Sequence, residues 1–327
     1  MVVRVGLLSA AHVHAGSYAS SLNALPNVEF VGVWDDDVAR GKAAADGWNT
    51  AFYADLETLL SADLNAVIIT AENVQHAPLT RAAAAHKLAV LCEKPLALSV
   101  ADGEAMIFAC REAGVPLMTA FPCRFSPVAL RLKATIDSGA IGKVQAIKGT
   151  NRGRNPGSWF NDLAKAGGGA VIDHTVHVAD LIHWLTGDRA STVFAEVDNS
   201  FHHKDFDDAG TMLIRYESGM FATLDCSWSR PKSYPTWGDV TLEIIGEKGS
   251  VYGDLFAQHF RVYSEETGRM DEAPWCDNID LAMVKAFVEA VESGKPVPVT
   301  GEDGLAAVKV AFGAYASAKS GAATRAS

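Results

Sequence analysis

Apolar runs alternate with helical stretches through the first 120 residues. Val3–Leu8 is a continuous apolar run of the kind found in strands buried on both faces, and a helix-like stretch, Ala15–Leu25, follows it directly. The remaining runs expected to be strands in this half are Val28–Trp34, Ala66–Thr70, Leu88–Cys92 and Val115–Ala120. Because short helical connections return each strand parallel to the last, with right-handed crossovers, this half predicts a doubly wound α/β domain.

The pattern changes after about residue 121. Two helical stretches, Ala129–Ser138 and Val171–Leu185, precede a series of strand-like runs that are separated only by turns. These runs are Thr192–Val197, Thr211–Tyr216, Phe221–Trp228, Val240–Ile245, Ser250–Tyr252 and His259–Tyr263. Strands without intervening helices pair mostly antiparallel. We therefore predict two domains, 1–121 and 122–327, the second an α/β domain with a large, mostly antiparallel open sheet. Two further helices close the chain, and the tail Ser320–Ser327 is expected to fray.

Composition excludes several kinds of partner. The 327 residues include 28 Lys+Arg and 39 Asp+Glu, for a net charge of −11, and such a surface repels nucleic-acid phosphates. No apolar run approaches the roughly 20 residues of a membrane span, so no membrane partner is expected. The five cysteines are scattered without a C-x-x-C pair, which indicates reduced thiols and a cytoplasmic location.

The turn after the first strand lacks the expected glycines. A dinucleotide fold places G-x-G-x-x-G there, and the corresponding positions are Ser9, Ala11 and His14. Ser9 and Ala11 are small enough for the backbone to approach a pyrophosphate, whereas His14 departs from the pattern. His12 and His14 also form the H-x-H that opens metal-dependent hydrolases built on barrels. A barrel would continue its strand–helix alternation, so we predict no metal and keep this hydrolase as the least favoured alternative.

Asp35 ends the second predicted strand. An acidic side chain there accepts hydrogen bonds from the adenosine ribose and repels a 2′-phosphate, and Asp36 adds negative charge. The alternative is that this acidic run only caps the following helix. The position favours NAD over NADP.

Glu93-Lys94-Pro95 follows the predicted strand Leu88–Cys92. Ligands of open α/β sheets bind outside the carboxyl ends of the strands. A lysine there, a donor-only cation, is suited to hold a carbonyl or alkoxide oxygen during hydride transfer. The alternative is a solvated lysine in a turn.

Asp173 and His177 lie four residues apart on the helix that follows three glycines, Gly167–Gly169. They therefore share one helix face. A carboxylate beside an imidazole raises its basicity, as abstraction of a hydroxyl proton requires. An isolated pair of this kind can also be mere surface decoration.

Three segments together resemble the glucose–fructose oxidoreductase/inositol dehydrogenase/MocA family: Thr70–His76, Cys92–Ser99 and Gly167–Asp180. The resemblance covers nearly the whole chain and implies an N-terminal Rossmann dinucleotide-binding domain. It also implies that Lys94, Asp173 and His177 occupy the catalytic positions, and that Asn73 and His76 lie beside the nicotinamide. The residues expected at the cofactor are Ser9, Ala11, His12, Asp35, Asp36, Thr70, Asn73, His76, Glu93 and Lys94.

Several further side chains are candidates for binding substrate. They are Arg124, Arg152, Trp159, His174, Tyr234 and Trp237. Arg124 matches a family arginine, His174 follows a catalytic position, and the aromatic side chains offer stacking surfaces for a sugar ring, although aromatics near strands are usually core.

The function predicted is NAD-dependent interconversion of a secondary hydroxyl and a ketone on a sugar, inositol or related polyol. His177, supported by Asp173, would take the hydroxyl proton, and Lys94 would stabilise the alkoxide. A homodimer or homotetramer through the open sheet is expected. The alternatives within the fold are a non-catalytic NAD- and sugar-binding regulator and NAD-assisted glycoside elimination.

Overall fold

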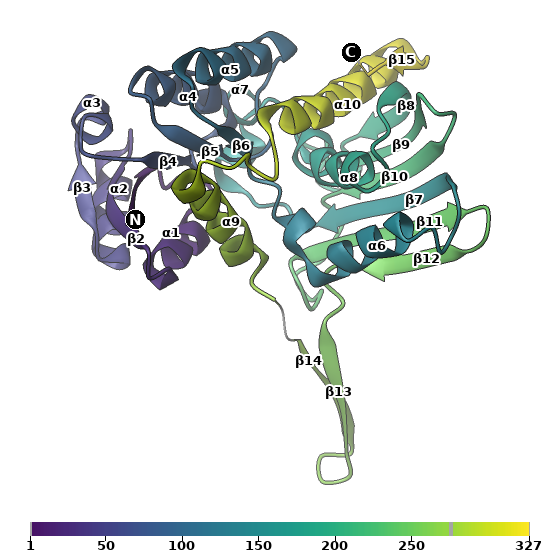
Figure 1. Ribbon diagram of the computed structural model, residues 1–327. Coiled ribbons are helices and arrows are strands. Elements are labelled where there is room, and N and C mark those ends of the chain that lie inside the picture. Colours follow the sequence, from purple (N-terminus) through teal and green to yellow (C-terminus); the bar gives the residue numbers. More distant parts are fainter. Residues whose placement is uncertain (1, 275–276, 327) are drawn as a thin grey trace. The chain divides into compact units, whose positions relative to one another are not determined.

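The computed structural model describes residues 2–274 and 277–326. It divides into two compact units (Figure 1), each assembled from three stretches of the chain. The first comprises Met1–Pro122, Pro156–Gly168 and Asp280–Lys309, and the second Cys123–Asn155, Gly169–Ile279 and Val310–Ser327. The domain boundary after residue 121 stays a prediction.

The first unit contains a six-stranded parallel sheet in the order β3-β2-β1-β4-β5-β6. Its strands are β1 Val3–Leu8, β2 Val28–Trp34, β3 Ala51–Tyr53, β4 Ala66–Ile69, β5 Ala89–Cys92 and β6 Leu117–Thr119. The strand order reverses on either side of the β1–β4 pair. Ligands of such sheets usually bind at the carboxyl ends of the strands beside this reversal. The predicted Rossmann domain is confirmed.

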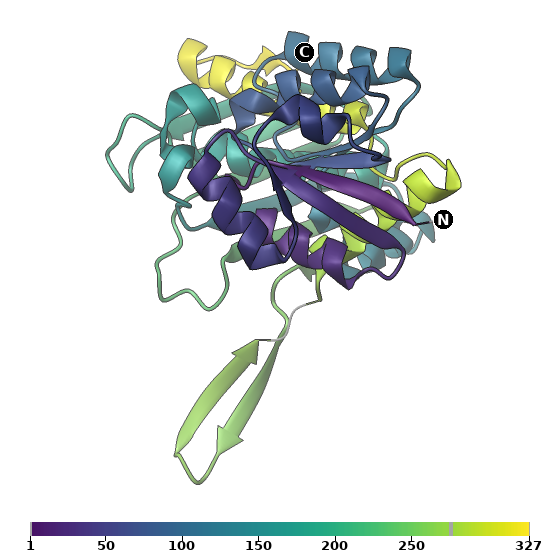
Figure 2. The same ribbon diagram turned by 90° about the vertical axis from the view of Figure 1, so that its left-hand side faces the viewer.

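Helices cover this sheet above and below (Figure 2). They include α1 Ala15–Ala24, α2 Val38–Trp48, α3 Leu56–Leu60, α4 His76–Ala85, α5 Val100–Ala113, α7 Leu163–Ala166 and α9 Ile279–Ser293. Strand side chains such as Val5, Leu7 and Val33 are fully buried beneath them. Asp37 caps α2 through the backbone N–H groups of Ala39 and Arg40. One residue of the acidic run therefore acts as the helix cap, which leaves Asp35 for another role.

The second unit contains a seven-stranded sheet in the order β12-β11-β7-β10-β9-β8-β15. Its strands are β7 Val144–Gly153, β8 Ala190–Asp198, β9 Ala209–Tyr216, β10 Phe221–Ser227, β11 Gly238–Gly246, β12 Ser250–Asp254 and β15 Thr324–Arg325. Only β7 and β10 pair parallel, so the prediction of a mostly antiparallel sheet is confirmed. The helices α6 Pro127–Asp137 and α8 Ala170–Thr186 pack on it, and α10 Gly301–Ser320 precedes β15 (Figure 1).

One strand of this unit was missed, and one expectation about the unit is wrong. The strand β7 was not predicted, although it lies inside the sheet between β11 and β10. The tail does not fray throughout, because Thr324 and Arg325 pair with β8. A separate hairpin, β13 His259–Ser264 and β14 Arg269–Pro274, extends the predicted strand near residue 260.

Four cysteines, Cys92, Cys110, Cys123 and Cys226, are buried free thiols, and Cys276 lies outside the described residues. Among the helices of residues 2–274 and 277–326, none is long and apolar enough to span a bilayer. The cytoplasmic location stays a prediction.

Within the described residues, one face of the seven-stranded sheet carries exposed apolar side chains. Along β9 every second residue is buried, and the intervening ones are exposed. Phe194 on β8 lies opposite Leu213 on β9, and Phe221 on β10 adds a third large apolar side chain to the exposed set. Adjacent exposed apolar side chains on a sheet favour association. We therefore propose that the predicted homo-oligomer forms through this face.

Replacing Leu213 with Glu should shift the protein towards monomer, because association would then bury an unpaired charge. Leu130→Glu is the matched control, since Leu130 is an exposed leucine on α6, away from the sheet face. Light scattering during size-exclusion chromatography measures the mass. A Leu213→Glu variant with unchanged mass would exclude this face as the interface.

Candidate active site

The first turn adopts the dinucleotide-binding conformation without glycine. Ser9, at the position of the first motif glycine, has φ of 73°, in the left-handed region that side chains other than glycine rarely enter. The Ser9 hydroxyl compensates by accepting from the backbone N–H of Ala11 at 3.2 Å and contacting the Asp35 carboxylate at 3.3 Å. Thr70 at the end of β4 donates to the Ser9 carbonyl. The turn thus keeps the backbone shape that accommodates a pyrophosphate, and the residues fit the cofactor.

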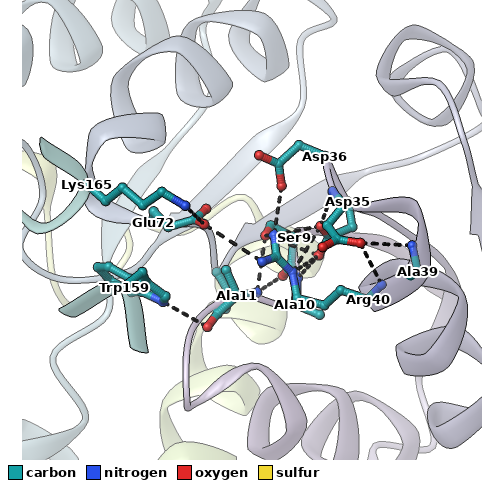
Figure 3. Close-up of polar contacts among 12 residues, drawn as sticks. Ser9, Ala10, Ala11, Asp35, Asp36, Ala39, Arg40, Glu72, Trp159 and Lys165 are labelled. Atoms are coloured by element: carbon teal, nitrogen blue, oxygen red, sulfur yellow. Dashed lines mark hydrogen bonds and ion pairs between the residues drawn. The ribbon is translucent and has the colours of Figure 1, made fainter. Parts of the chain in front are cut away.

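Asp35 is buried at the end of β2 and holds the turn together (Figure 3). It accepts from the backbone N–H groups of Ala10 at 2.6 Å and Asp37 at 2.8 Å. Arg40 binds it with two nitrogens, Nε at 2.9 Å from Oδ2 and Nη2 at 2.7 Å from Oδ1. Burial acts to raise the pKa of Asp35, but the hydrogen bonds from Arg40 and the backbone lower it below its ordinary value. Asp35 is therefore an ionised carboxylate, and both of its oxygens are bound by Arg40.

Arg40 links further acidic side chains to this position. Its Nη2 lies 2.7 Å from Asp36 and its Nη1 lies 3.8 Å from Glu72, which in turn is 3.4 Å from the Lys165 ammonium (Figure 3). Sequence reasoning missed Arg40 and Glu72. The available signal was an arginine five residues after Asp35, in the first turn of a helix that begins beside it.

Glu93, at the end of β5, is fully buried against two imidazoles. Its Oε1 lies 2.9 Å from His14 Nδ1 and 3.5 Å from His12 Nδ1, and its Oε2 accepts from the Lys94 backbone N–H at 3.0 Å. Burial acts to raise the pKa of Glu93, but the two histidines lower it well below its ordinary value. Conversely, burial acts to lower the pKa of His14, and Glu93 raises it above its ordinary value. Glu93 and His14 therefore form an ion pair.

The Lys94 side chain is only 4% exposed at the carboxyl end of β5. His76 is buried beside this turn and lies 2.9 Å through Nδ1 from the Pro95 carbonyl. Burial lowers the pKa of His76, so the ring is neutral at physiological pH and steadies the turn by a hydrogen bond.

A segment from later in the chain closes over the first turn within the same unit. Asn73 donates to the Ala166 carbonyl at 2.9 Å, and Trp159 Nε1 donates to the Ala11 carbonyl at 2.9 Å. The Trp159 ring also stacks on Phe160. Trp159 was expected among the substrate residues, and the structure places it against the cofactor turn.

In the second unit the helix α8 carries Asp173, His174 and His177, all buried. His174 Nδ1 lies 2.9 Å from the Asn151 carbonyl, which only accepts, so this nitrogen carries the proton. Asp173 Oδ2 accepts from Trp228 Nε1 at 3.2 Å and lies 3.3 Å from His174 Nε2. Sequence reasoning missed Trp228, and the expected Asp173–His177 pair stays a prediction.

His177 Nδ1 lies 4.0 Å from the Cys123 thiol. The amino end of α8 is capped from a distant loop: the backbone N–H groups of Gly169 and Val171 donate to Asp207 at 2.8 and 2.7 Å. The loop at residues 202–208 is only partly solvated, because Phe206 and Asp208 within it are buried.

The remaining substrate candidates lie in the second unit. Arg124 forms a buried two-pronged pair with Asp180 at 2.7 and 2.5 Å, and Arg152 lies 3.2 Å from Asp239. The Tyr234 ring lies under the Arg230 guanidinium, and the Trp237 ring meets His174 edge-on at 5.1 Å. The structure brings Trp237 and His174 together, whereas Arg124 and Arg152 form ion pairs with acidic side chains of their own unit.

The strain at Ser9 can be measured. Ser9→Gly and Ser9→Ala both remove the hydroxyl, but only glycine tolerates the positive φ. The glycine variant should therefore have a free energy of unfolding about 1 kcal/mol higher than the alanine variant. Urea denaturation checks the order. Equal stability of the two variants would mean that the turn is not strained.

Comparison with known proteins agrees with this geometry. Residues 2–121 match the model of an oxidoreductase family with an NAD-binding Rossmann fold, and residues 129–252 match the GFO/IDH/MocA C-terminal domain. The chain is an NAD(P)-dependent dehydrogenase of the class that acts on CH–OH groups. It belongs to the GFO/IDH/MocA family, and the predictions of family, enzyme class and NAD as cofactor are confirmed.

Individual relatives are similar over almost their whole length. The chain is 27% identical to the myo-inositol 2-dehydrogenase of Thermotoga maritima over 95% of each chain. It is 26% identical to the D-apiose dehydrogenase of Paraburkholderia graminis over 98% of this chain and 87% of that protein. The crystal structure of GenD2 from gentamicin A biosynthesis, in complex with NAD, superposes with a TM-score of 0.90 at 26% identity, covering 99% of this chain and 96% of that one.

Proposed function

We propose that this protein oxidises a secondary hydroxyl of a sugar, inositol or related polyol to a ketone, reversibly. The relatives named as inositol and apiose dehydrogenases support this substrate class. The observation that carries the proposal is Lys94, a buried cation at the carboxyl end of a parallel strand in an NAD-binding fold. Burying an ammonium group is costly in free energy. A lysine that is buried at the ligand end of the sheet is therefore a candidate for stabilising negative charge on a substrate.

The chemistry divides between the side chains. When bound, NAD supplies the hydride acceptor. His177 removes the hydroxyl proton, and Asp173 supplies a carboxylate on the same helix, four residues before that histidine. Lys94 donates a hydrogen bond to the oxygen as negative charge develops on it. In the reverse direction the protonated His177 returns the proton to the oxygen of the ketone.

Lys94→Ala and His177→Ala should each lower kcat by at least about 10²-fold, as expected when acid–base or electrostatic catalysis is lost. NADH formation across sugars, inositols and glycosides measures kcat, and fluorescence titration measures NADH affinity, which should change less, above all for His177→Ala. The control is His183→Ala, a histidine near the other end of the same helix. Normal turnover by His177→Ala would remove this helix from the catalytic machinery.

A double variant tests whether Lys94 and His177 serve the same step. If they do, the combined loss should be smaller than the product of the two separate losses, since residues that act as a unit are not additive. Multiplicative losses would indicate independent roles.

Cofactor choice should depend on Asp35 and Arg40 together. Asp35→Ser removes the buried carboxylate that Arg40 binds with two nitrogens, so part of the guanidinium can pair with a 2′-phosphate while Asp36 stays beside it. We expect this single change to raise the NADPH-to-NADH affinity ratio by about tenfold, equivalent to about 1.4 kcal/mol.

The double variant Asp35→Ser/Arg40→Ala is the matched control and should show a smaller rise in that ratio. Equilibrium fluorescence with each reduced cofactor gives both affinities. A wild type that binds NADPH more tightly than NADH would contradict the ribose role of Asp35.

A further inference from the structure

Three potential metal ligands meet at the carboxyl edge of the parallel sheet. His12 and His14 follow β1, and Glu93 follows β5. One ligand atom from each lies within 4.8 Å of the other two. No other group of three or more histidine, cysteine or acidic side chains in the described part of the chain meets this spacing. The H-x-H of the sequence and the glutamate of Glu93-Lys94-Pro95 therefore form one cluster.

The spacing matches a tetrahedral ion. Zinc bound at the usual distances of about 2.0–2.2 Å separates neighbouring ligand atoms by about 3.3–3.4 Å. The distances from Glu93 Oε1 are 2.9 Å to His14 Nδ1 and 3.5 Å to His12 Nδ1, on either side of that value. The third separation, between the two histidine nitrogens, is below 4.8 Å, so the three ligand atoms surround one position.

One histidine nitrogen in this cluster carries no proton. The backbone N–H of His14 donates to Nδ1 of His12 at 3.2 Å, so this nitrogen holds a lone pair, and a bound ion would take the place of that hydrogen bond. The side chains of His12 and Glu93 are fully buried, and that of His14 is 30% exposed. Two ligands are therefore held in place by the protein interior, and the third borders solvent, from which an ion can enter.

We propose that His12, His14 and Glu93 bind one Zn²⁺ ion, with the fourth coordination position open. Two imidazoles and one carboxylate form a donor set that zinc accepts at three-ligand sites.

The test uses NAD-free protein and Co²⁺, whose visible absorption reports coordination, followed by Zn²⁺ displacement in a calorimeter. Wild type should bind one equivalent, with visible bands that Zn²⁺ abolishes. His14→Ala and Glu93→Gln should each weaken Co²⁺ binding by at least about tenfold. Replacing a residue that only orients a metal ligand already costs about that much in metal affinity, and these two residues are the proposed ligands themselves. Each change removes one partner of the pair between His14 and Glu93, so circular dichroism is used to verify that both variants keep the wild-type fold.

His86→Ala is the matched control. His86 lies 3.0 Å from Glu57 and forms a histidine–glutamate pair outside the cluster, so this variant should bind Co²⁺ as the wild type does. Wild type that does not saturate near one equivalent, or His14→Ala and Glu93→Gln variants that bind like wild type, would overturn the proposal. Metal binding is read without substrate or NAD, so its outcome is independent of the dehydrogenase assay.

Discussion

Close approach of α8 to the seven-stranded sheet is the constraint on which the second unit depends. A Cβ added at Gly149 on β7 would lie 2.8 Å from Val178, and one added at Gly210 on β9 would lie 2.5 Å from Val171. Both contacts are shorter than real Cβ atoms allow, so the helix can occupy this position only against glycine. Fourteen of the seventeen residues of α8 are buried, among them the polar residues Asp173, His174, Thr175, His177 and Asp180.

Burial makes the polar side chains of α8 costly unless each has a partner. Asp180 pairs with Arg124, Asp173 accepts from Trp228, and His174 contacts the Asn151 carbonyl. The carboxylate of Asp207 satisfies N–H groups at the helix start, where the helix dipole favours negative charge. An apolar helix would fill this space at lower cost, which favours a functional reason for the polar face.

The sequence predicted most strands and helices of the first unit because continuous apolar runs and helix caps are local signals, but it missed the short elements β3 and α3. It predicted the position of Lys94 and of Asp35 for the same reason, since each directly follows a buried strand. β7 was missed because its glycines and charged residues weaken the strand pattern, and only the packing of α8 explains Gly149. Asp207 was missed because its partners at the start of α8 are set by tertiary folding, whereas Arg40 had a local signal in its position five residues after Asp35.

At the first turn, the departure from the expected motif at His14 is accommodated by a buried partner. His14 occupies the third glycine position, where a ring would normally obstruct the approach of helix to strand. Here the ring turns to the buried Glu93, and the ion pair offsets part of the cost of burying that carboxylate. The other oxygen of Glu93 accepts from the backbone N–H of Lys94. One carboxylate thus connects the cofactor turn to the proposed catalytic lysine. A substitution at position 14 should therefore alter the position of Lys94, because two hydrogen bonds link the two residues through Glu93.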